Sequence, residues 1–297
     1  MSIHVSTLHF LLAINKEKKI KGNFLSIGKQ TVYISYKKIE SVLNKYFKKK
    51  NLKKKILSID NFTRNKNLKN IDDSSLLGLF TKTKYYALDK SSYENADKIL
   101  DLNNKNIPTK FVGKYDFIYD GGTLDNIFSP SQGISNFSKI LKTNGRILHT
   151  NVGGAWPGAY CSFSCEWFYS FYANNNYKNV QVYLLIPEKG EWPNPNYSIY
   201  LYSPYFKRKK NYDPLYASKQ RDLTGATIIC YAEKGEKSSN NKIPIQSHYI
   251  EKDESDWRKK SIIFSKKKIS SLMLDKKINK KKLPFLSNHY KFIGSTN

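Results

Sequence analysis

Hydrophobic and polar positions along residues 114–154 follow the order strand, turn, helix, strand. Residues 115–119 form a short apolar run that ends at Asp120. Gly121 and Gly122 then allow the backbone to turn sharply where a ligand can approach. This order is typical of one half of an open, parallel α/β sheet.

A helix is predicted after this turn. Ser129 stands at the N-cap, Pro130 at the first helical position, and Gln132 where it would close a capping box. The Asn-Gly pair at 144–145 is expected to end the helix, and 146–150 to form the next strand. Apolar residues recur at helical spacing in between, at Ile134, Phe137, Ile140 and Leu141. Parallel strands joined in this way share one carboxyl edge, where ligands of such sheets bind.

The stretch KYDFIYDGGTLDNIF, with LKTNGR after it, resembles the distal half of class I S-adenosylmethionine-dependent methyltransferases. In that family the region commonly reads FDxVxDGGTLEHIF and LKPGGR. Here Asp125-Asn126 replaces Glu-His, and Thr143-Asn144 precedes a single glycine. The resemblance implies a Rossmann-like three-layer α/β sandwich. Its sheet would be mostly parallel and seven-stranded, with one antiparallel strand, and its cofactor would be S-adenosylmethionine.

The first strand of this resemblance lies at 23–28, NFLSIG. The family pattern is an acidic residue followed by three alternating glycines. In this chain Ser26 replaces the acid, Gly28 keeps the first glycine, and Gln30 and Val32 occupy the other two positions. The resemblance places Gly28 and Gln30 beside the amino-acid end of the cofactor.

Two segments compete for the second strand, 56–60 and 85–89, each ending in an aspartate. The spacing from Gly28 favours Asp60. The following run, LDKSSYENADKILDLN, resembles a methyltransferase subgroup and favours Asp89, with residues of about 50–80 as an insertion. Such a carboxylate can accept hydrogen bonds from both ribose hydroxyls.

The third strand is expected at 99–103. Here Asp101 would accept from the adenine amino group, and Leu102 would offer a backbone amide and an apolar face; alternatively, Asp101 only caps a turn. The polar run after the fourth strand would lie beside the sulfonium and amino-acid portion of the cofactor. This run comprises Asp120, Gly121, Gly122 and Thr123. Asp120 could also be a plain turn former.

The substrate side should follow residue 154, with an aromatic loop at 155–163 and a helix starting at Ser164. Strands are expected at 180–186 and 227–232, with a Pro-, Tyr- and Lys-rich excursion through 187–226 between them. His149, at the end of the fifth strand, is the one histidine placed to act as a general base, or else it is structural. No metal site is expected, because the three cysteines (Cys161, Cys165 and Cys230) lack zinc-ligand spacing and suit free thiols.

The domain prediction is a peripheral N-terminal segment at 1–22, in which a helix with Val5, Leu8 and Leu12 would cover one face of the sheet, a methyltransferase-like domain at 23–235 and a basic extension at 236–297. Within the extension, 266–282 is expected to be solvated surface or, as the alternative, a lone amphipathic helix. No segment approaches about 18 apolar residues, so no membrane span is expected. The start lacks a signal-peptide pattern, and a cytoplasmic location is expected.

The formal net charge of +27 invites a nucleic-acid hypothesis, but nearly all the basic residues are lysines rather than arginines. The resemblance implies, as the leading hypothesis, methyl transfer to an oxygen or nitrogen of a small molecule or glycan precursor. The alternatives are an RNA or polyanion methyltransferase that uses the Lys-rich tail, and a non-catalytic binding module with this fold. The missing glycine fingerprint argues against an NAD-linked dehydrogenase.

Overall fold

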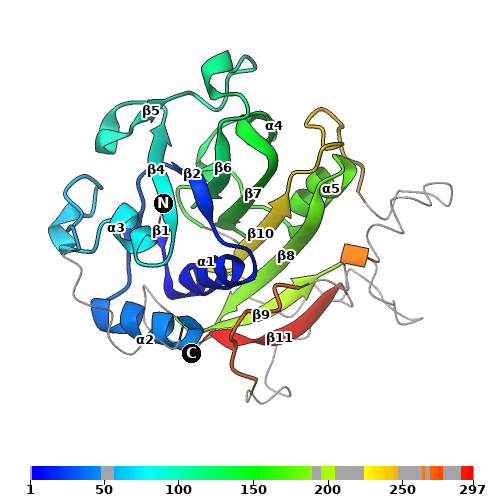
Figure 1. Ribbon diagram of the computed structural model, residues 1–297. Helices are drawn as coiled ribbons and strands as arrows, with labels where there is room; N and C mark the ends of the chain where they lie inside the picture. The colour runs from blue at the N-terminus through cyan, green and yellow to red at the C-terminus, as the bar shows by residue number, and fades with distance from the viewer. Residues whose placement is uncertain are drawn as a thin grey trace.

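The computed structural model describes residues 2–47, 57–154, 156–188, 195–204, 224–246, 263–264, 268–276 and 289–296. These residues form a nine-stranded sheet with the spatial order β11-β9-β8-β10-β7-β6-β2-β4-β5 (Figure 1). The strands are β2 (Lys21–Ile27), β4 (Lys82–Asp89), β5 (Lys98–Ile99), β6 (Tyr115–Asp120), β7 (Leu141–Val152), β8 (Lys178–Pro187), β9 (Tyr197–Tyr202), β10 (Thr227–Glu233) and β11 (Tyr290–Thr296). A separate parallel pair joins β1 (Ser2–Ile3) to β3 (Thr31–Val32).

The sheet changes character at β7. Every pair from β5 to β7 is parallel. Every pair from β7 to β11 is antiparallel, so β9 and β10 run against the other strands. The α/β class is confirmed, but the prediction of seven strands with one antiparallel strand is wrong. The added strands β9 and β11 come from the excursion and from the extension, and they cover the edge that β8 would otherwise leave open.

Helices cover both faces of the sheet (Figure 1). On one face lie α1 (Val5–Glu17), α2 (Tyr36–Phe47) and α3 (Asp73–Gly78), and on the other lie α4 (Pro130–Ile140) and α5 (Cys165–Asn174). The strands supply each face by alternation: on β6, Phe117 and Tyr119 pack toward α1 and α2, whereas Ile118 packs toward α4. The result is three layers with two hydrophobic cores.

The N-terminal segment contains the helix that was predicted to cover one face of the sheet, and this helix, α1, is more deeply buried than a peripheral segment. All residues of α1 from Val5 to Asn15 are buried, because this helix is apolar on nearly every side and carries no charge before Lys16. His9 lies within it, with its Nδ1 3.0 Å from the Tyr46 hydroxyl of α2. Residues 2–17 therefore belong to the core.

The helix α4 begins as predicted, with Ser129 at the N-cap and Pro130 at the first position. The capping box is wrong, because Ser129 makes no side-chain cap bond and Gln132 donates to Asn136 instead. The helix also ends earlier than expected, at Ile140. Asn144 has a left-handed backbone (φ 63°) inside β7, where its amide donates to the Lys234 carbonyl.

The choice of β4 as the second strand is confirmed by its parallel pairing with β2. Ile59, in the competing segment, makes only an isolated bridge to Ile71. Part of the predicted tail helix lies outside the described residues, and the described part, 268–276, contains no helix. Among the described residues, no helix is both long and apolar enough to cross a membrane.

Candidate functional site

A cavity of about 550 Å³ opens at the carboxyl edge of the parallel strands; we call it the first cavity. Four successive strand ends contribute to it. The predicted residues that line it are Gly28 after β2, Asp89 at the end of β4, Asp101 and Leu102 after β5, and Thr123 after β6. Its size is that of a typical small-ligand site. The polar turns that the sequence indicated therefore do meet at one place.

The turn after β2 is narrow and held by backbone contacts. Gly28 has a left-handed φ of 74°, and its amide donates to the Leu88 carbonyl at 2.6 Å. The Ser26 hydroxyl donates to the Gly28 carbonyl at 2.7 Å. A left-handed residue at this point favours glycine, which explains the glycine at position 28.

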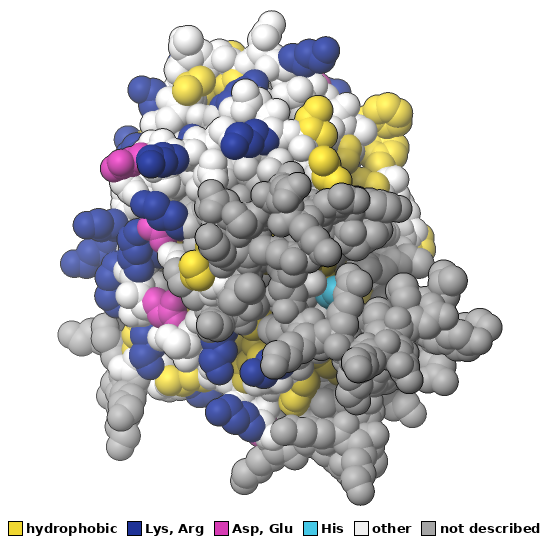
Figure 2. Space-filling model, turned by 90° about the vertical axis from the view of Figure 1, so that its right-hand side faces the viewer, with side chains coloured by type: hydrophobic (Ala, Val, Ile, Leu, Met, Phe, Trp, Pro, Cys, Tyr) yellow, Lys and Arg dark blue, Asp and Glu magenta, His cyan; other side chains and the backbone are white. Residues whose placement is uncertain are grey.

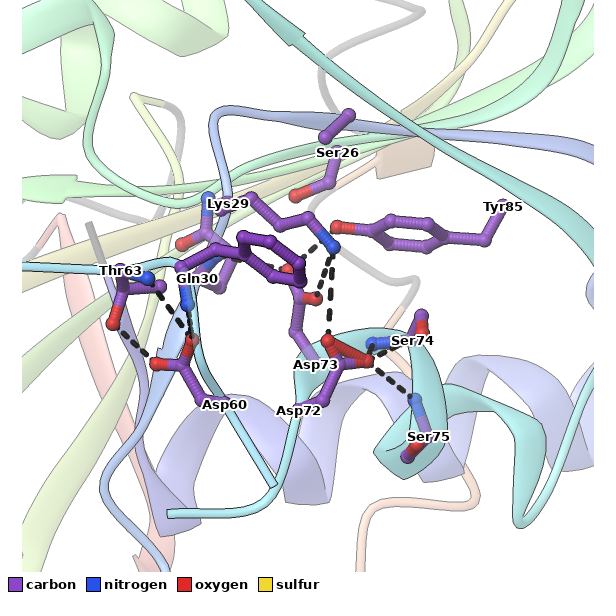
Figure 3. Close-up of polar contacts among 12 residues, drawn as sticks. Ser26, Lys29, Gln30, Asp60, Thr63, Asp72, Asp73, Ser74, Ser75 and Tyr85 are labelled. Atoms are coloured by element: carbon purple, nitrogen blue, oxygen red, sulfur yellow. Dashed lines mark hydrogen bonds and ion pairs between the residues drawn. The ribbon is translucent and has the colours of Figure 1, made fainter. Parts of the chain in front are cut away.

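A buried carboxylate from α3 holds the rest of this loop (Figure 3). Asp73 accepts from the Gln30 amide at 2.8 Å and from the Tyr85 hydroxyl at 2.5 Å. The Lys29 ammonium lies 3.7 Å from Asp73 and 3.6 Å from Asp72. Burial raises the pKa of Asp73 to about 6, although Lys29 and Tyr85 act in the opposite direction. The predicted insertion thus carries the anchor of the loop.

The other acids of the insertion shape the insertion itself (Figure 3). Asp72 caps α3 by accepting from the amides of Ser74 and Ser75. Asp60, the rival candidate for ribose binding, accepts from the amides of Phe62 and Thr63. Asp60 is buried and does not line the first cavity.

Gln30 lies outside the first cavity, although it was predicted to bind cofactor. Its side-chain amide donates to the carbonyls of Ile27 and Gly28 at 2.8 and 3.1 Å. Its Oε1 is 2.1 Å from the place where a Cβ on Gly121 would be. Gln30 therefore fills the space between the turns after β2 and β6, and Gly121 is glycine because of this close approach.

Asp89 and Asp101 reach the first cavity from neighbouring turns. The Asp89 carboxylate accepts from the Lys90 amide. Asp101 accepts from the Asn103 amide and side chain, both at 2.9 Å, and lies 3.5 Å from the Lys90 ammonium. The hydrogen bond from the Asn103 backbone amide is the main reason why the pKa of Asp101 is lowered. Asp101 is thus a turn former and also an ionised acceptor at the cavity wall.

Asp120 and His149 form a buried hydrogen-bond chain instead of lining a cavity. Asp120 accepts from His149 Nδ1 at 2.8 Å, from Asn151 Nδ2 at 2.9 Å and from the Thr123 amide at 2.8 Å. His149 Nε2 is 2.6 Å from the Tyr172 hydroxyl. Both Asp120 and His149 are fully buried. With both ring nitrogens engaged, His149 is placed as a structural residue, and its predicted role as general base gains no support from this geometry.

A second cavity, of about 270 Å³, lies beside the first and shares Arg64, Asn65 and Asn126 with it. Gly121 and Gly122, predicted as cofactor residues, line this second cavity instead. Gly122 has a left-handed φ of 93°, which suits glycine. The two predicted glycines therefore lie on the far side of the shared wall from Gly28.

Several residues at the first cavity were missed by sequence reasoning. Lys29 and Arg64 bring positive charge to it. Arg64 forms no ion pair with any residue in the described part of the chain. Exposed aromatic rings surround the opening, with Phe128 and Tyr160 edge to face at 6.0 Å between ring centroids. Arg64 is one of few arginines in a lysine-rich chain, which was the available signal.

Cys161, Cys165 and Cys230 are free thiols. Within the described ranges, no cluster of three or more His, Cys, Asp or Glu side chains could hold a metal ion.

No protein-family model and no curated protein matches this chain. Solved structures with a similar fold include the CMeT domain of citrinin polyketide synthase, at 11% identity and a TM-score of 0.40, covering 78% of this chain and 52% of that one. A methyltransferase from Thermotoga maritima, described as a possible histamine N-methyltransferase, matches at 11% identity and a TM-score of 0.34 over 76% of this chain and 91% of its own.

Phosphoethanolamine N-methyltransferase 2 of Haemonchus contortus, in complex with S-adenosylmethionine, matches at 11% identity and a TM-score of 0.38, over 76% of this chain and 52% of its own. This chain thus spans about half of that enzyme and of the polyketide synthase domain. A putative Zn-dependent alcohol dehydrogenase from Rhodobacter sphaeroides is also similar, at a TM-score of 0.27. At these values the likeness carries no argument about chemistry, which has to come from the residues of this chain.

Proposed function

We propose that this chain is an S-adenosylmethionine-dependent methyltransferase whose first cavity holds the cofactor. One observation carries the proposal: Gly28, Asp89 and Asp101, which follow or end three adjacent parallel strands, line a single cavity. Ligands of open parallel sheets bind at this edge, in the crevice beyond the carboxyl ends of the strands. The cavity combines acidic acceptors with cations, as a ligand with hydroxyls, amines and a carboxylate requires.

The residues fit such a ligand part by part. Asp89 would accept from the ribose hydroxyls, and the free capacity of Asp101 Oδ2 would serve the adenine amino group. Arg64 would pair with the carboxylate of the amino-acid end, since a guanidinium binds carboxylates in a fork. Apolar walls for the adenine ring come from Ile27, Leu88, Leu100, Leu102 and Ile127.

When bound, S-adenosylmethionine supplies a methyl group activated by its sulfonium. The task of the protein is then to align the acceptor and to exclude water. Gly28 and Gln30 keep the loop after β2 close to the turn after β6, and Asp73 fixes that loop from below. The aromatic residues at the opening, Phe128 and Tyr160, are placed to limit water entry.

A small acceptor is favoured over RNA or another polyanion. Among the described residues that line the second cavity, Arg64 is the only Lys or Arg. On the described part of the face in Figure 2, acidic side chains lie among the basic ones. A polyanion-binding surface would concentrate positive charge along one track.

Isothermal titration calorimetry with S-adenosylmethionine, S-adenosylhomocysteine and NAD⁺ tests the proposal on the full chain. We expect both adenosyl ligands to bind with a Kd of about 1–100 μM, and NAD⁺ not to bind. Absence of S-adenosylhomocysteine binding at about 1 mM would overturn the methyltransferase assignment and favour the non-catalytic module. Tight NAD⁺ binding alone would instead favour a dehydrogenase.

A further inference from the structure

Several separate parts of the chain form the walls of the second cavity. Ser2, Ser6 and Thr7 come from the N-terminal segment, Asp125 from the turn after β6, and Asn151 from the end of β7. The cavity touches the first one through their shared residues, so a molecule in each would lie next to the other. The cavity volume of about 270 Å³ restricts its occupant to a compact molecule.

Two buried oxygens at this cavity have no hydrogen-bond partner. They are Oδ1 of Asp125 and Oδ1 of Asn151. The orientation of Asn151 is fixed, because its Nδ2 donates to the Asp120 carboxylate, which leaves Oδ1 as an acceptor. Leaving a buried acceptor without a donor is destabilising, because the acceptor loses its water and gains no partner. Both residues therefore call for an occupant that donates hydrogen bonds.

The rest of the lining is rich in groups that both donate and accept. The hydroxyls of Thr7 and Thr150 have no regular hydrogen bond, although both lie near enough to the Tyr119 hydroxyl to interact with it. Trp156, 44% exposed, adds an aromatic surface to the same cavity. Such a wall suits an occupant with several hydroxyl groups. A cationic amine would instead favour several carboxylates, and Asp125 is the only carboxylate among the described lining residues.

Asp125 also has the basicity that proton removal needs. It is 4% exposed, and burial, followed by the nearby charge of Asp120, raises its pKa to about 6. A carboxylate with this pKa is ionised at pH 7.5 and is a stronger base than an exposed aspartate. Among the described residues, its Oδ1 has no hydrogen-bond partner.

We infer that the second cavity binds the methyl acceptor, that the acceptor is a polyhydroxylated small molecule such as a monosaccharide unit, and that Asp125 removes the proton from the hydroxyl that is methylated. This inference rests on the proposed methyltransferase function. In the reaction the acceptor oxygen bonds to the methyl carbon, the sulfur–methyl bond breaks with its electron pair left on sulfur, and the hydroxyl proton passes to the Asp125 carboxylate. The products are a methyl ether, S-adenosylhomocysteine and a protonated Asp125.

The test combines binding and turnover on the full chain. Saturation-transfer difference NMR, with S-adenosylhomocysteine present, compares glucose, galactose, N-acetylglucosamine, rhamnose and myo-inositol with ethanolamine, spermidine and a short oligonucleotide. We expect at least one polyol to give the strongest signal, and Trp156→Ala to weaken it. With that polyol as acceptor, Asp125→Asn should lower kcat about 10²- to 10⁴-fold, with KM changed far less. The exposed Glu236, which lines neither cavity, provides the matched control Glu236→Gln, which should leave both values unchanged.

The outcomes separate the inference from the proposed function. If wild type binds S-adenosylhomocysteine but none of the polyols, or prefers an amine or the oligonucleotide, the acceptor assignment is overturned and the methyltransferase proposal stands. Equal kcat for wild type and Asp125→Asn overturns the role of Asp125. The variant should bind S-adenosylhomocysteine within about twofold of wild type, which shows that it is folded. If Asp125→Asn does not fold, the pH profile of wild-type kcat tests the role of Asp125 instead. The value of kcat must fall as the pH drops below about 6 if Asp125 is the base.

Discussion

The pKa of a carboxyl group is shifted in opposite directions at the two cavities, downward for Asp101 in the first and upward for Asp125 in the second. In the first cavity, Asp101 accepts from the Asn103 amide, and this bond lowers its pKa. In the second cavity, Asp125 has a buried oxygen without a donor, and burial raises its pKa. A carboxylate that accepts a hydrogen bond from the backbone of its own turn stays ionised, so it can accept hydrogen bonds from a ligand over a wide pH range. A carboxylate without support is poised to take up a proton, which is the property of a base.

The largest expected effect concerns the support of the first cavity. Asp73→Ala should lower the free energy of unfolding by about 3 kcal/mol, because it leaves the Gln30 amide and the Tyr85 hydroxyl without their acceptor. S-adenosylhomocysteine binding should fall at least tenfold as the loop loses its anchor. Urea denaturation and calorimetry check both values. If the variant is as stable as wild type, the loop does not depend on the insertion.

A pH-dependent stability effect sharpens the contrast at Asp125. The pKa of Asp125 is about 6 in the folded state and 3.8 ordinarily. Between about pH 4 and pH 6, the carboxyl is therefore protonated in the folded chain and ionised in the unfolded chain. Its contribution to stability is therefore fully present below about pH 4 and lost as the pH rises through about 6. Asp125→Asn should raise the free energy of unfolding by about 2–3 kcal/mol at pH 8.

The same substitution should give little or no gain at about pH 3, where Asp125 is mostly protonated in both states. Thermal and urea unfolding of both proteins at the two pH values measure the difference. A gain of equal size at both pH values would mean that packing, not charge, causes it.

Asp89→Asn should act on ligand binding and not on folding. We expect the Kd for S-adenosylhomocysteine to rise roughly 10- to 100-fold, the effect of weakening charged hydrogen bonds of about 1.5–3 kcal/mol. The melting temperature without ligand should stay close to that of wild type. Asp125→Asn is the matched control, because it removes a carboxylate from the other cavity. If both variants lose binding equally, the two cavities do not have separate roles.

Lys90→Ala should have the smallest effect. Lys90 is 74% exposed, and its ion pair with Asp101 at 3.5 Å is worth at most about 1 kcal/mol. The Kd for S-adenosylhomocysteine should change less than about fivefold, and the change should shrink at high salt. A larger change would show that Lys90 contacts the ligand directly.

The first cavity was predictable because its residues belong to local patterns. Asp89 and Gly28 each stand at the end of an apolar run, and strand ends of a parallel sheet share an edge. The second cavity was not predictable, since residues 2–7 reach it only through the tertiary placement of the buried helix α1. In the sequence, Asp125 stands out only because Asp125-Asn126 replaces Glu-His in the motif that resembles the methyltransferase pattern. Its unpaired oxygen is a property of packing that no sequence window contains.

The errors in the predicted fold have similar causes. β9 is buried at every position, so it lacks the alternation that marks a half-buried strand. β11 lies about 90 residues further along the chain and pairs with β9, a contact that local patterns do not encode. Asn144 reads as the end of a helix because it favours a left-handed backbone, and it does adopt one, but within a strand.

The wall between the two cavities is shared, so binding in one cavity can affect binding in the other. Arg64, Asn65 and Asn126 face both spaces, and the side chains of Asn65 and Asn126 are already held by hydrogen bonds. A ligand in one cavity that fixes Arg64 would therefore spare a ligand in the other cavity the cost of ordering that side chain. Such coupling would be mutual: the factor by which a ligand in the first cavity raises the affinity of the second cavity would equal the factor by which a ligand in the second cavity raises the affinity of the first.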